Sequence, residues 1–359
     1  MKVIVTTPSF NRRGGVAVFF KTLSQYYSTS VTFVTTGSNL ESDRGIRGWY
    51  GMVATLVRVR SLLRQGQYSL IHVNPSLDFV SLIRDGSFLI LAKMYRVPSL
   101  VLLHGWLPEV EEKLKRYFLP LFRWLFFSAK VFVVLGFEFE QKLRSMGFTG
   151  LVFRLFPPVD DKLLTDVGEE EIRLRHMGRR NPVVLFLARI EEQKGIFTLI
   201  KAFEQLQETL PSAELLIAGA GPDEAEMRSR LEHSKTLNYS LIGHVEGKEK
   251  ISVFKRSSVY VLPSVLEGLP LSVLEGMALG LPIITRPVGG LKDFFQVDKM
   301  GYLMNGVDPA ELAGLLHQCL RKTEALVEMG IFNYRYAREN FLASRIAESL
   351  EDIYGQYVI

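Results

Sequence analysis

The segment 262–276 places two glutamates on a predicted strand, turn and helix. Gly268 lies in the turn, and the helix begins near Pro270, because proline is well tolerated in a first helical turn. The free backbone N–H groups at such a helix end favour a phosphate. Glu267 and Glu275 are eight positions apart and can face one cleft, where carboxylate oxygens suit vicinal sugar hydroxyls. These residue types predict a site for a phosphorylated sugar.

A second cluster follows the first predicted strand of the second half. Arg189 stands at the strand end, and Lys194 lies five positions later, where a loop opens a helix. Two cations offset roughly the two charges of a pyrophosphate without a metal ion. The chain has no Asp-x-Asp pair, so we expect neither a metal nor a cofactor. The alternative is a solvated loop in which both cations pair with Glu191 or Glu192.

Two other classes of enzyme fit parts of these patterns. A pair of carboxylates can act as acid and base in a glycoside hydrolase, but the strand-turn-helix context and the nearby cations argue against that interpretation. Gly219 and Gly221 after a strand resemble a dinucleotide fingerprint, in which Glu224 stands at the place of the third glycine. We therefore do not expect a hydrolase or an NAD-dependent dehydrogenase.

Short β-branched apolar runs alternate with longer helical patterns along the chain, which is typical of parallel α/β sheets. In the first half the predicted strands are 2–6, 30–35, 70–73, 99–103, 130–135 and 151–155. In the second half they are 182–188, 213–218, 239–242, 259–262 and 282–285. Between the halves, two prolines and the charged stretch 169–180 suit a hinge and linker, which places the domain boundary within 157–181.

Composition predicts a folded chain of two domains. Its 359 residues correspond to about two domains at roughly 100–200 residues each. Residues 1–180 carry 25 lysines and arginines against 15 acidic residues (+10), and 181–359 carry 18 against 23 (−5). The basic half indicates an anionic partner of a kind that net charge does not identify. The single cysteine, Cys319, and an apolar start too short for a signal peptide predict a reducing, cytoplasmic location.

The most apolar stretch, 118–137, contains Arg123 and Lys130 and has Pro120 near its start, so we do not expect it to span a membrane. The overlapping segment 111–130 mixes basic and aromatic residues. It suits either a helix in the headgroup region of an anionic membrane or a core helix with buried aromatic rings. The charge of the first half favours the membrane, and no motif supports nucleic acid as the partner.

Together these motifs resemble the retaining GT-B glycosyltransferases of family 4. The resemblance covers nearly the whole chain and is most specific in the Glu-x7-Glu arrangement of Glu267 and Glu275. The other matching residues are Pro263-Ser264, Arg189, Lys194, Ala218-Gly219-Ala220-Gly221-Pro222, Asn11-Arg12-Arg13-Gly14-Gly15, Ile71-His72-Val73-Asn74 and His104-Gly105. Pro158-Val159-Asp160 stands where the family often has Asn-Gly-Val-Asp. This departure affects only the expected geometry of the hinge between the domains.

The resemblance implies a GT-B fold, with two Rossmann-like domains that face each other across a cleft. The acceptor-binding domain would cover 1–165 and the nucleotide-sugar-binding domain 166–335, and a C-terminal helix over 336–359 would pack on the first domain. The donor diphosphate would be held by Arg189 and Lys194, with backbone N–H groups of Gly15, Gly268 and Leu269.

Further roles follow from the same resemblance. Glu275 would bind the ribose, and Glu267 would bind the donor-sugar hydroxyls. The backbone around His244 and Val245 would meet the nucleobase. His104 would meet the donor sugar near its C6 hydroxyl. The expected activity is retaining, metal-independent transfer of a hexose from a UDP- or GDP-linked donor to a glycan or lipid-linked acceptor.

The alternative is a non-catalytic GT-B scaffold that binds a nucleotide sugar. Such a scaffold would be expected to lack one of the four donor-site residues Arg189, Lys194, Glu267 and Glu275, and all four are present. The expected role is in polysaccharide, lipopolysaccharide or glycolipid assembly. The expected place is the cytoplasm or the inner face of the plasma membrane.

Overall fold

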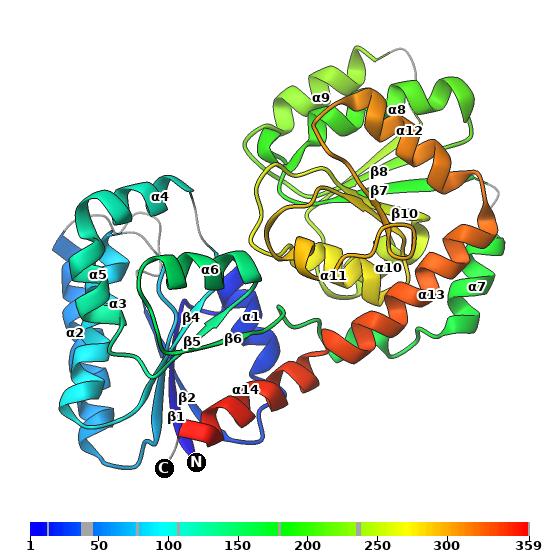
Figure 1. Ribbon diagram of the computed structural model, residues 1–359. Coiled ribbons are helices and arrows are strands. Elements are labelled where there is room, and N and C mark those ends of the chain that lie inside the picture. The colour runs from blue at the N-terminus through cyan, green and yellow to red at the C-terminus, as the bar shows by residue number, and fades with distance from the viewer. Residues whose placement is uncertain are drawn as a thin grey trace. The chain divides into compact units, whose positions relative to one another are not determined.

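A computed structural model divides the chain into two compact units, unit 1 (Met1–Pro158 with Ala343–Ile359) and unit 2 (Val159–Leu342). The structure describes residues 1–12, 14–36, 46–76, 79–105, 108–178, 181–234 and 238–357, with the backbone alone at 46–50 and 108–110. Each unit is a six-stranded parallel sheet between two layers of helices (Figure 1). This confirms the predicted α/β fold with one parallel sheet in each half.

Unit 1 orders its strands β2-β1-β3-β4-β5-β6. In chain order its elements are β1 (Lys2–Thr7), α1 (Gly15–Leu23), β2 (Ser30–Thr35), α2 (Ile46–Arg64), β3 (Leu70–Val73), α3 (Phe79–Met94), β4 (Ser99–Leu103), α4 (Pro108–Lys113), the π-helical turn η1 (Leu114–Phe118), α5 (Leu119–Phe126), β5 (Val131–Val134), α6 (Phe137–Ser145), β6 (Leu151–Arg154) and α14 (Ala343–Tyr357). On one face of the sheet α2, α3 and α5 lie side by side, and α1 adjoins α14 on the other (Figure 1).

Unit 2 orders its strands β12-β11-β10-β7-β8-β9. In chain order its elements are η2 (Asp161–Leu164), α7 (Glu169–Met177), β7 (Val183–Leu187), η3 (Glu192–Lys194), α8 (Ile196–Thr209), β8 (Glu214–Ala218), α9 (Glu224–Glu232), β9 (Tyr239–Gly243), α10 (Gly247–Arg256), β10 (Val259–Leu262), α11 (Leu271–Ala278), β11 (Ile283–Thr285), η4 (Gly289–Asp293), β12 (Gly301–Leu303), α12 (Pro309–Leu320) and α13 (Thr323–Asn340). Helices α8 and α12 lie together, as do α7, α13 and α11.

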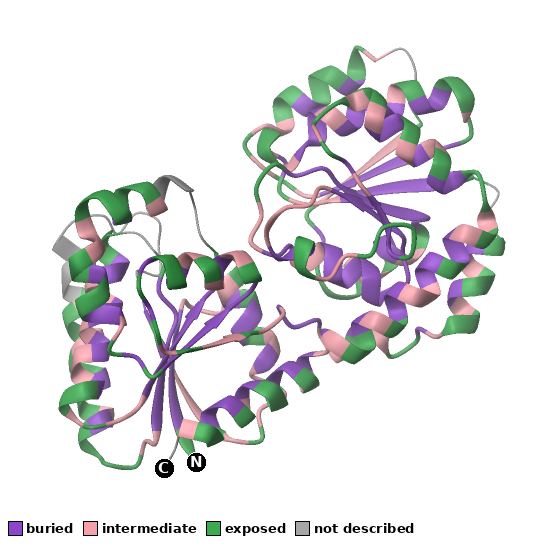
Figure 2. Cartoon of the chain, viewed as in Figure 1, coloured by how far each residue is buried: buried purple, intermediate pink, exposed green. Residues whose placement is uncertain are grey.

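The core of each unit lies between its sheet and its helices. Every residue of β4 and of β10 is buried, and Figure 2 shows the same for most of the central strands. Strands covered on both faces read as continuous apolar runs, which is why the sequence identified them without a period of two. Strand β12 was not predicted, because three residues at a sheet edge leave no readable pattern.

The prediction that 157–181 is a hinge and linker was wrong for most of its length. Residues 169–177 form α7, whose Ile172 and His176 are buried against α13. Of its charged residues, Arg175 is only 7% exposed and donates to the carbonyl of Leu279 at 2.6 Å. Val159 pairs with Leu342 as an isolated bridge. These contacts hold 159–177 within unit 2. The first division falls after Pro158, which is inside the predicted range 157–181 but earlier than the predicted domain end at 165.

The predicted C-terminal helix is divided between the units. Helix α13 continues to Asn340 and belongs to unit 2, and α14 begins at Ala343 and belongs to unit 1. In unit 1 the hydroxyl of Tyr354 on α14 lies 2.6 Å from Nδ1 of the buried His72. Glu351, one turn earlier, accepts hydrogen bonds from Ser28 and from the backbone of Thr29. Unit 2 therefore ends at Leu342, and not at residue 335, where the sequence placed the end of the second domain.

Candidate active site

The strand order of unit 2 reverses between the neighbouring strands β7 and β10. The chain continues from β7 toward β8 and β9 on one side, and from β10 toward β11 and β12 on the other. In open α/β sheets the loops at such a reversal diverge, and ligands bind between them. The loop after β7 carries Arg189 and Lys194, and the loop after β10 carries Glu267 and Gly268. The topology thus brings the two predicted clusters to one place.

Glycine and backbone hydrogen bonds hold these two loops together. Gly195 has a left-handed φ of 78°, and a Cβ there would lie 2.5 Å from the carbonyl oxygen of Pro263. The backbone N–H of Val265 and the hydroxyl of Ser264 both donate to the carbonyl of Gln193, at 2.8 and 3.1 Å. Only glycine allows so close an approach. The loop that carries Lys194 is therefore fixed against the loop that carries Glu267.

Lys194 and Glu267 form an ion pair across these loops. The ammonium Nζ donates to Oε1 of Glu267 at 2.7 Å, and the two side chains are 21% and 11% exposed. Charges this far removed from water interact more strongly than a surface pair. The predicted diphosphate cation and the predicted sugar-binding carboxylate are thus in direct contact, and an entering phosphate would compete with Glu267 for the same ammonium.

Arg189 lies in the same loop but has a different partner. Its side chain is 65% exposed, and its Nε lies 3.6 Å from a carboxylate oxygen of Glu191. The loop ion pair considered as the alternative for both cations is therefore present for Arg189, whereas Lys194 pairs with Glu267. In the described parts of the chain, no group of three or more His, Cys, Asp or Glu side chains could hold a metal ion.

The backbone of Gly268 and Leu269 leads into α11. The loop after β11 packs against it: the N–H of Gly290 donates to the carbonyl of Gly268 at 2.7 Å, and a Cβ on Gly289 would lie 1.9 Å from the same oxygen. Leu269 is buried. The first N–H groups of a helix have no partner within the helix and carry partial positive charge. The N-terminus of α11 is therefore fixed in place at the carboxyl edge of the sheet, the same edge that carries Lys194.

Glu275 lies in the second turn of α11 and is paired with a lysine that sequence reasoning missed. Nζ of Lys250, on α10, lies 2.5 Å from Oε1 of Glu275, whose side chain is 7% exposed. The hydroxyl of Tyr260 on β10 donates to the carbonyl of Leu187 on β7 and lies 2.7 Å from the hydroxyl of Ser272 on α11. Burial raises the pKa of Tyr260, which keeps it a neutral donor. These hydrogen bonds fix α11, the helix that carries Glu275, against strands β10 and β7.

His244 and Val245 follow β9, two strands from β7. His244 is exposed, with Nε2 2.9 Å from a carboxylate oxygen of Glu246, and Val245 is buried. At the end of β8, between these strands, the N–H of Gly219 donates to the carbonyl of Gly243 at 2.7 Å. A Cβ on Gly219 would lie 1.9 Å from the carbonyl of Ala188. The predicted nucleobase residues therefore lie at the carboxyl end of β9, next to the ends of β7 and β8.

Unit 1 has a polar cluster of its own at the carboxyl ends of β1, β3 and β4. Nε2 of His104 lies 3.0 Å from Oδ1 of Asn74, and Nδ2 of Asn74 donates to the carbonyl of Thr6 at 2.7 Å. Because that carbonyl can only accept, the amide orientation is fixed, and Nε2 of His104 carries the proton. Burial lowers the pKa of His104 to about 3. Near neutral pH its Nδ1 is therefore an acceptor.

Aromatic rings hold His104 in place. Phe19 and Phe20, on α1, stand edge-on to the imidazole with ring centroids 4.8 and 5.8 Å away. Gly15 is the first residue of this helix, and Arg13 of the same glycine-pair motif lies outside the described residues. The sequence located His104 and Gly15, but it gave Asn74 no role. The position of Asn74 directly after the predicted strand 70–73 was the feature of the sequence that could have indicated a role for it.

The chain matches known proteins most clearly in unit 2. Residues 170–335 match a family model described as glycosyl transferases group 1. This segment belongs to that family. The group 1 domain contains every candidate site residue of unit 2, from Arg189 to Glu275.

Curated relatives cover part of the chain. D-inositol 3-phosphate glycosyltransferase of Corynebacterium diphtheriae is 31% identical over 182 residues, which are 48% of this chain and 42% of that protein. A putative colanic acid biosynthesis glycosyltransferase of Salmonella typhimurium, WcaL, is 24% identical over 216 residues, which are 57% of this chain and 51% of that protein. The matches thus span about half the length of these relatives.

Solved structures match the fold of nearly the whole chain. Anabaena HepE, solved with UDP and with UDP-glucose, has a TM-score of 0.75 and 16% identity, and the match covers 99% of this chain and 100% of HepE. Sucrose-phosphate synthase from Thermosynechococcus elongatus has a TM-score of 0.72 and 18% identity, with 99% and 98% covered. These likenesses confirm the expected GT-B fold with two Rossmann-like sheets.

Proposed function

We propose that this protein is a retaining, metal-independent glycosyltransferase. It moves a hexose from a UDP- or GDP-linked sugar to a glycan or lipid-linked acceptor in polysaccharide, lipopolysaccharide or glycolipid assembly. The observation that carries the proposal is the pairing of Lys194 with Glu267 and of Lys250 with Glu275, beside the reversal of strand order in the group 1 domain. The relatives named as glycosyltransferases and the UDP complexes of HepE support it.

The proposed mechanism needs no enzyme nucleophile. The bond between the anomeric carbon and the diphosphate breaks, and charge on the leaving phosphate is stabilised by Lys194, Arg189 and the N-terminus of α11. The acceptor oxygen attacks from the same face, its proton passes to the leaving phosphate, and configuration is retained. Glu267 orients the sugar hydroxyls, and Glu275 binds the ribose.

Titration calorimetry with UDP and GDP, followed by assays of donor turnover, tests this proposal. We expect micromolar to millimolar binding of one nucleoside diphosphate and its sugar, unchanged by a chelator, and slow release of the diphosphate with water as acceptor. NMR of the product would show the anomeric configuration of the donor. Binding without any turnover would favour the non-catalytic scaffold, and an inverted product would contradict retention.

His104 is proposed to accept a hydrogen bond from the donor sugar through Nδ1. Asn74→Asp tests this, because a carboxylate beside Nε2 stabilises the imidazolium and raises the pKa of His104. The aspartate also loses the hydrogen bond to the carbonyl of Thr6, so some loss is expected at every pH. Because the protonated ring loses its acceptor as well, we expect donor turnover to fall roughly tenfold further at about pH 6 than at about pH 8.5. The pH profile of the turnover number measures this. A loss of equal size at every pH would show that Asn74 has only a structural role.

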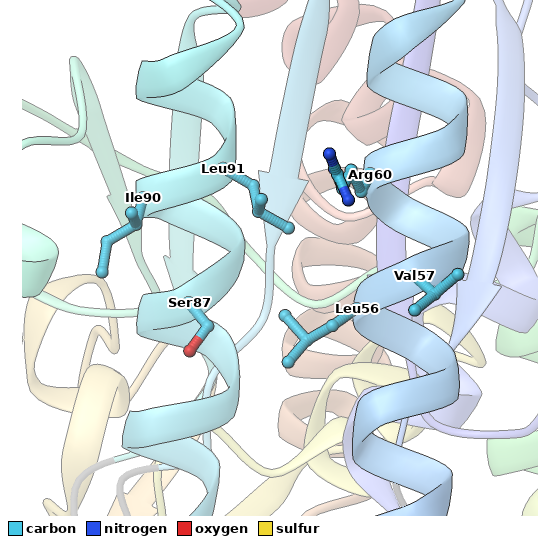
Figure 3. Close-up of a pocket in the computed structure, with 6 residues that line it drawn as sticks. All are labelled: Leu56, Val57, Arg60, Ser87, Ile90 and Leu91. Carbon is cyan, nitrogen blue, oxygen red and sulfur yellow. The ribbon is translucent and has the colours of Figure 1, made fainter.

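We also propose that unit 1 docks on an anionic membrane surface through the layer of α2, α3 and α5. The segment 111–130 buries Leu114 and Phe122, but Tyr117 and Trp124 are 61% and 68% exposed, and Arg116 lies over the Tyr117 ring. Helix α2 has no acidic residue. With α3 it borders a groove of about 300 Å³ lined by Leu56, Val57, Arg60, Ser87, Ile90 and Leu91 (Figure 3).

These features together are typical of a face that lies in the headgroup region. In the described ranges no helix is long and apolar enough to cross a bilayer. Attachment at the inner face of the plasma membrane would bring a lipid-linked acceptor within reach of unit 1.

Co-sedimentation with vesicles tests the membrane proposal. We expect binding to phosphatidylglycerol vesicles and little binding to phosphatidylcholine vesicles. Lys115→Glu/Arg116→Glu should weaken the binding about tenfold or more, since each basic residue near an anionic surface contributes roughly 1 kcal/mol. The matched control is Arg228→Glu/Arg230→Glu on α9 of unit 2. Equal binding by the two double variants would contradict the proposal.

A further inference from the structure

Arg286, at the carboxyl end of β11, has two guanidinium nitrogens without partners. Nε and Nη1 are both buried, and neither has a hydrogen-bond partner among the described residues. The residue as a whole is half-buried, so its unpaired nitrogens lie just below the surface of unit 2. In unit 1, by contrast, Arg84 donates twice to the carboxylate of Asp85, at 2.8 Å each. Arg286 therefore has two donors that the described part of the chain leaves unpaired.

An unpaired buried charge is unfavourable, because the group loses water and gains nothing in return. Native proteins hydrogen-bond nearly all their buried polar groups, and an exception calls for a ligand, an ion or a functional role. Arg286 also forms no ion pair with a described carboxylate. A bound anion would satisfy its charge and its donors once the side chain turns toward it.

The loop that begins at Arg286 is built against the loop of Glu267. Thr285, the last residue of β11, donates through its hydroxyl to the carbonyl of Leu262 on β10, at 2.7 Å. Four positions after Arg286, the N–H of Gly290 donates to the carbonyl of Gly268. Arg286 thus stands at the carboxyl edge of the sheet, one strand beyond β10, where the group 1 domain is proposed to hold its donor.

We infer that Arg286 binds an anionic group of the donor. The planar guanidinium matches the paired oxygens of a phosphate or a carboxylate. The group is either a phosphate of the diphosphate or a carboxylate on the transferred sugar. Lys194 and Arg189 already have Glu267 and Glu191 as counter-ions, whereas Arg286 has none among the described carboxylates. The inference rests on the proposed function, since it requires that a nucleotide sugar binds in unit 2.

Titration calorimetry of the full chain separates the two sources of the anion. The ligands are UDP, UDP-glucose, UDP-glucuronic acid and GDP-mannose, and the variants are Arg286→Gln and Arg286→Lys. The control is Arg228→Gln, which removes an exposed arginine from α9. We expect Arg286→Gln to weaken binding about 10- to 100-fold, Arg286→Lys to restore part of it, and the control to stay within about twofold of wild type. Loss with every bound ligand assigns the diphosphate, and loss with UDP-glucuronic acid alone assigns the sugar carboxylate.

Stability of the ligand-free protein provides the second readout. Because Arg286→Gln removes an unpaired buried charge, urea unfolding should show the variant to be at least as stable as wild type. Reduced stability with unchanged affinity for every ligand would overturn the inference, and so would unchanged affinity at equal stability; either result leaves the proposed function intact. Failure of wild type to bind any of the four ligands would overturn the proposed function and the inference with it.

Discussion

Lys194→Ala is expected to lower donor turnover by about three orders of magnitude without unfolding the protein, since removing one placed charge at a reacting centre typically has an effect of that size. Lys194 is the better placed of the two predicted cations, because it is largely removed from water and Arg189 is not. Its loss also leaves Glu267 as an unpaired carboxylate at the place where the diphosphate must bind. The variant therefore replaces attraction with repulsion at the leaving group.

The measurement is the turnover number and the Michaelis constant for the donor, with circular dichroism to check folding. Lys201→Ala is the matched control, because Lys201 lies one to two turns into α8 and is exposed. Lys194→Ala/Glu267→Gln separates the two contributions: removing the repulsion should restore part of the donor affinity but not the turnover number. Turnover near that of wild type in Lys194→Ala would show that Lys194 does not hold the diphosphate.

Substitutions of Glu275 and of Lys250 are expected to have different effects: the first weakens nucleotide binding, and the second lowers the stability of the fold. Glu275→Gln should weaken binding of the nucleoside diphosphate about 10- to 100-fold, because an amide cannot accept from both ribose hydroxyls as a carboxylate does. The variant keeps an oxygen for Lys250, so the fold should be nearly as stable as before. Lys250→Ala should instead lower the free energy of unfolding by about 2 kcal/mol, since it leaves the buried Glu275 carboxylate without its counter-ion.

Urea unfolding and calorimetry on the two variants test this asymmetry. Lys255→Ala, also on α10, is the control for Lys250→Ala; its ammonium donates to the backbone carbonyl of Asp166 in an exposed position and has no part in the Glu275 pair. Should Glu275→Gln bind UDP or GDP as wild type does, the assignment of Glu275 to the ribose fails. Should Lys250→Ala be as stable as wild type, the pair with Glu275 has no structural role.

The sequence alone determined the elements and the residue types of the site. Most strands were located within a residue or two, because strands buried on both faces are short apolar runs bounded by turn residues. Glu267, Glu275 and Lys194 could be predicted as candidate site residues because a helix start, a glycine turn and charged residues at fixed spacing are local features. The GT-B fold followed from the resemblance that these motifs carry, and the solved structures confirmed it.

Only the tertiary structure decided which side chains meet. Lys194 pairs with Glu267 rather than with Glu191 or Glu192, Lys250 reaches Glu275 from another helix, and Asn74 orients His104 from a neighbouring strand. The two guanidinium nitrogens of Arg286 that lack a partner among the described residues likewise have no signature in the sequence. These contacts join residues far apart in the chain, and they depend on strand order, on loop approach through Gly195 and on burial. Local periodicity carries none of that information, because it reports how a segment folds and not what packs against it.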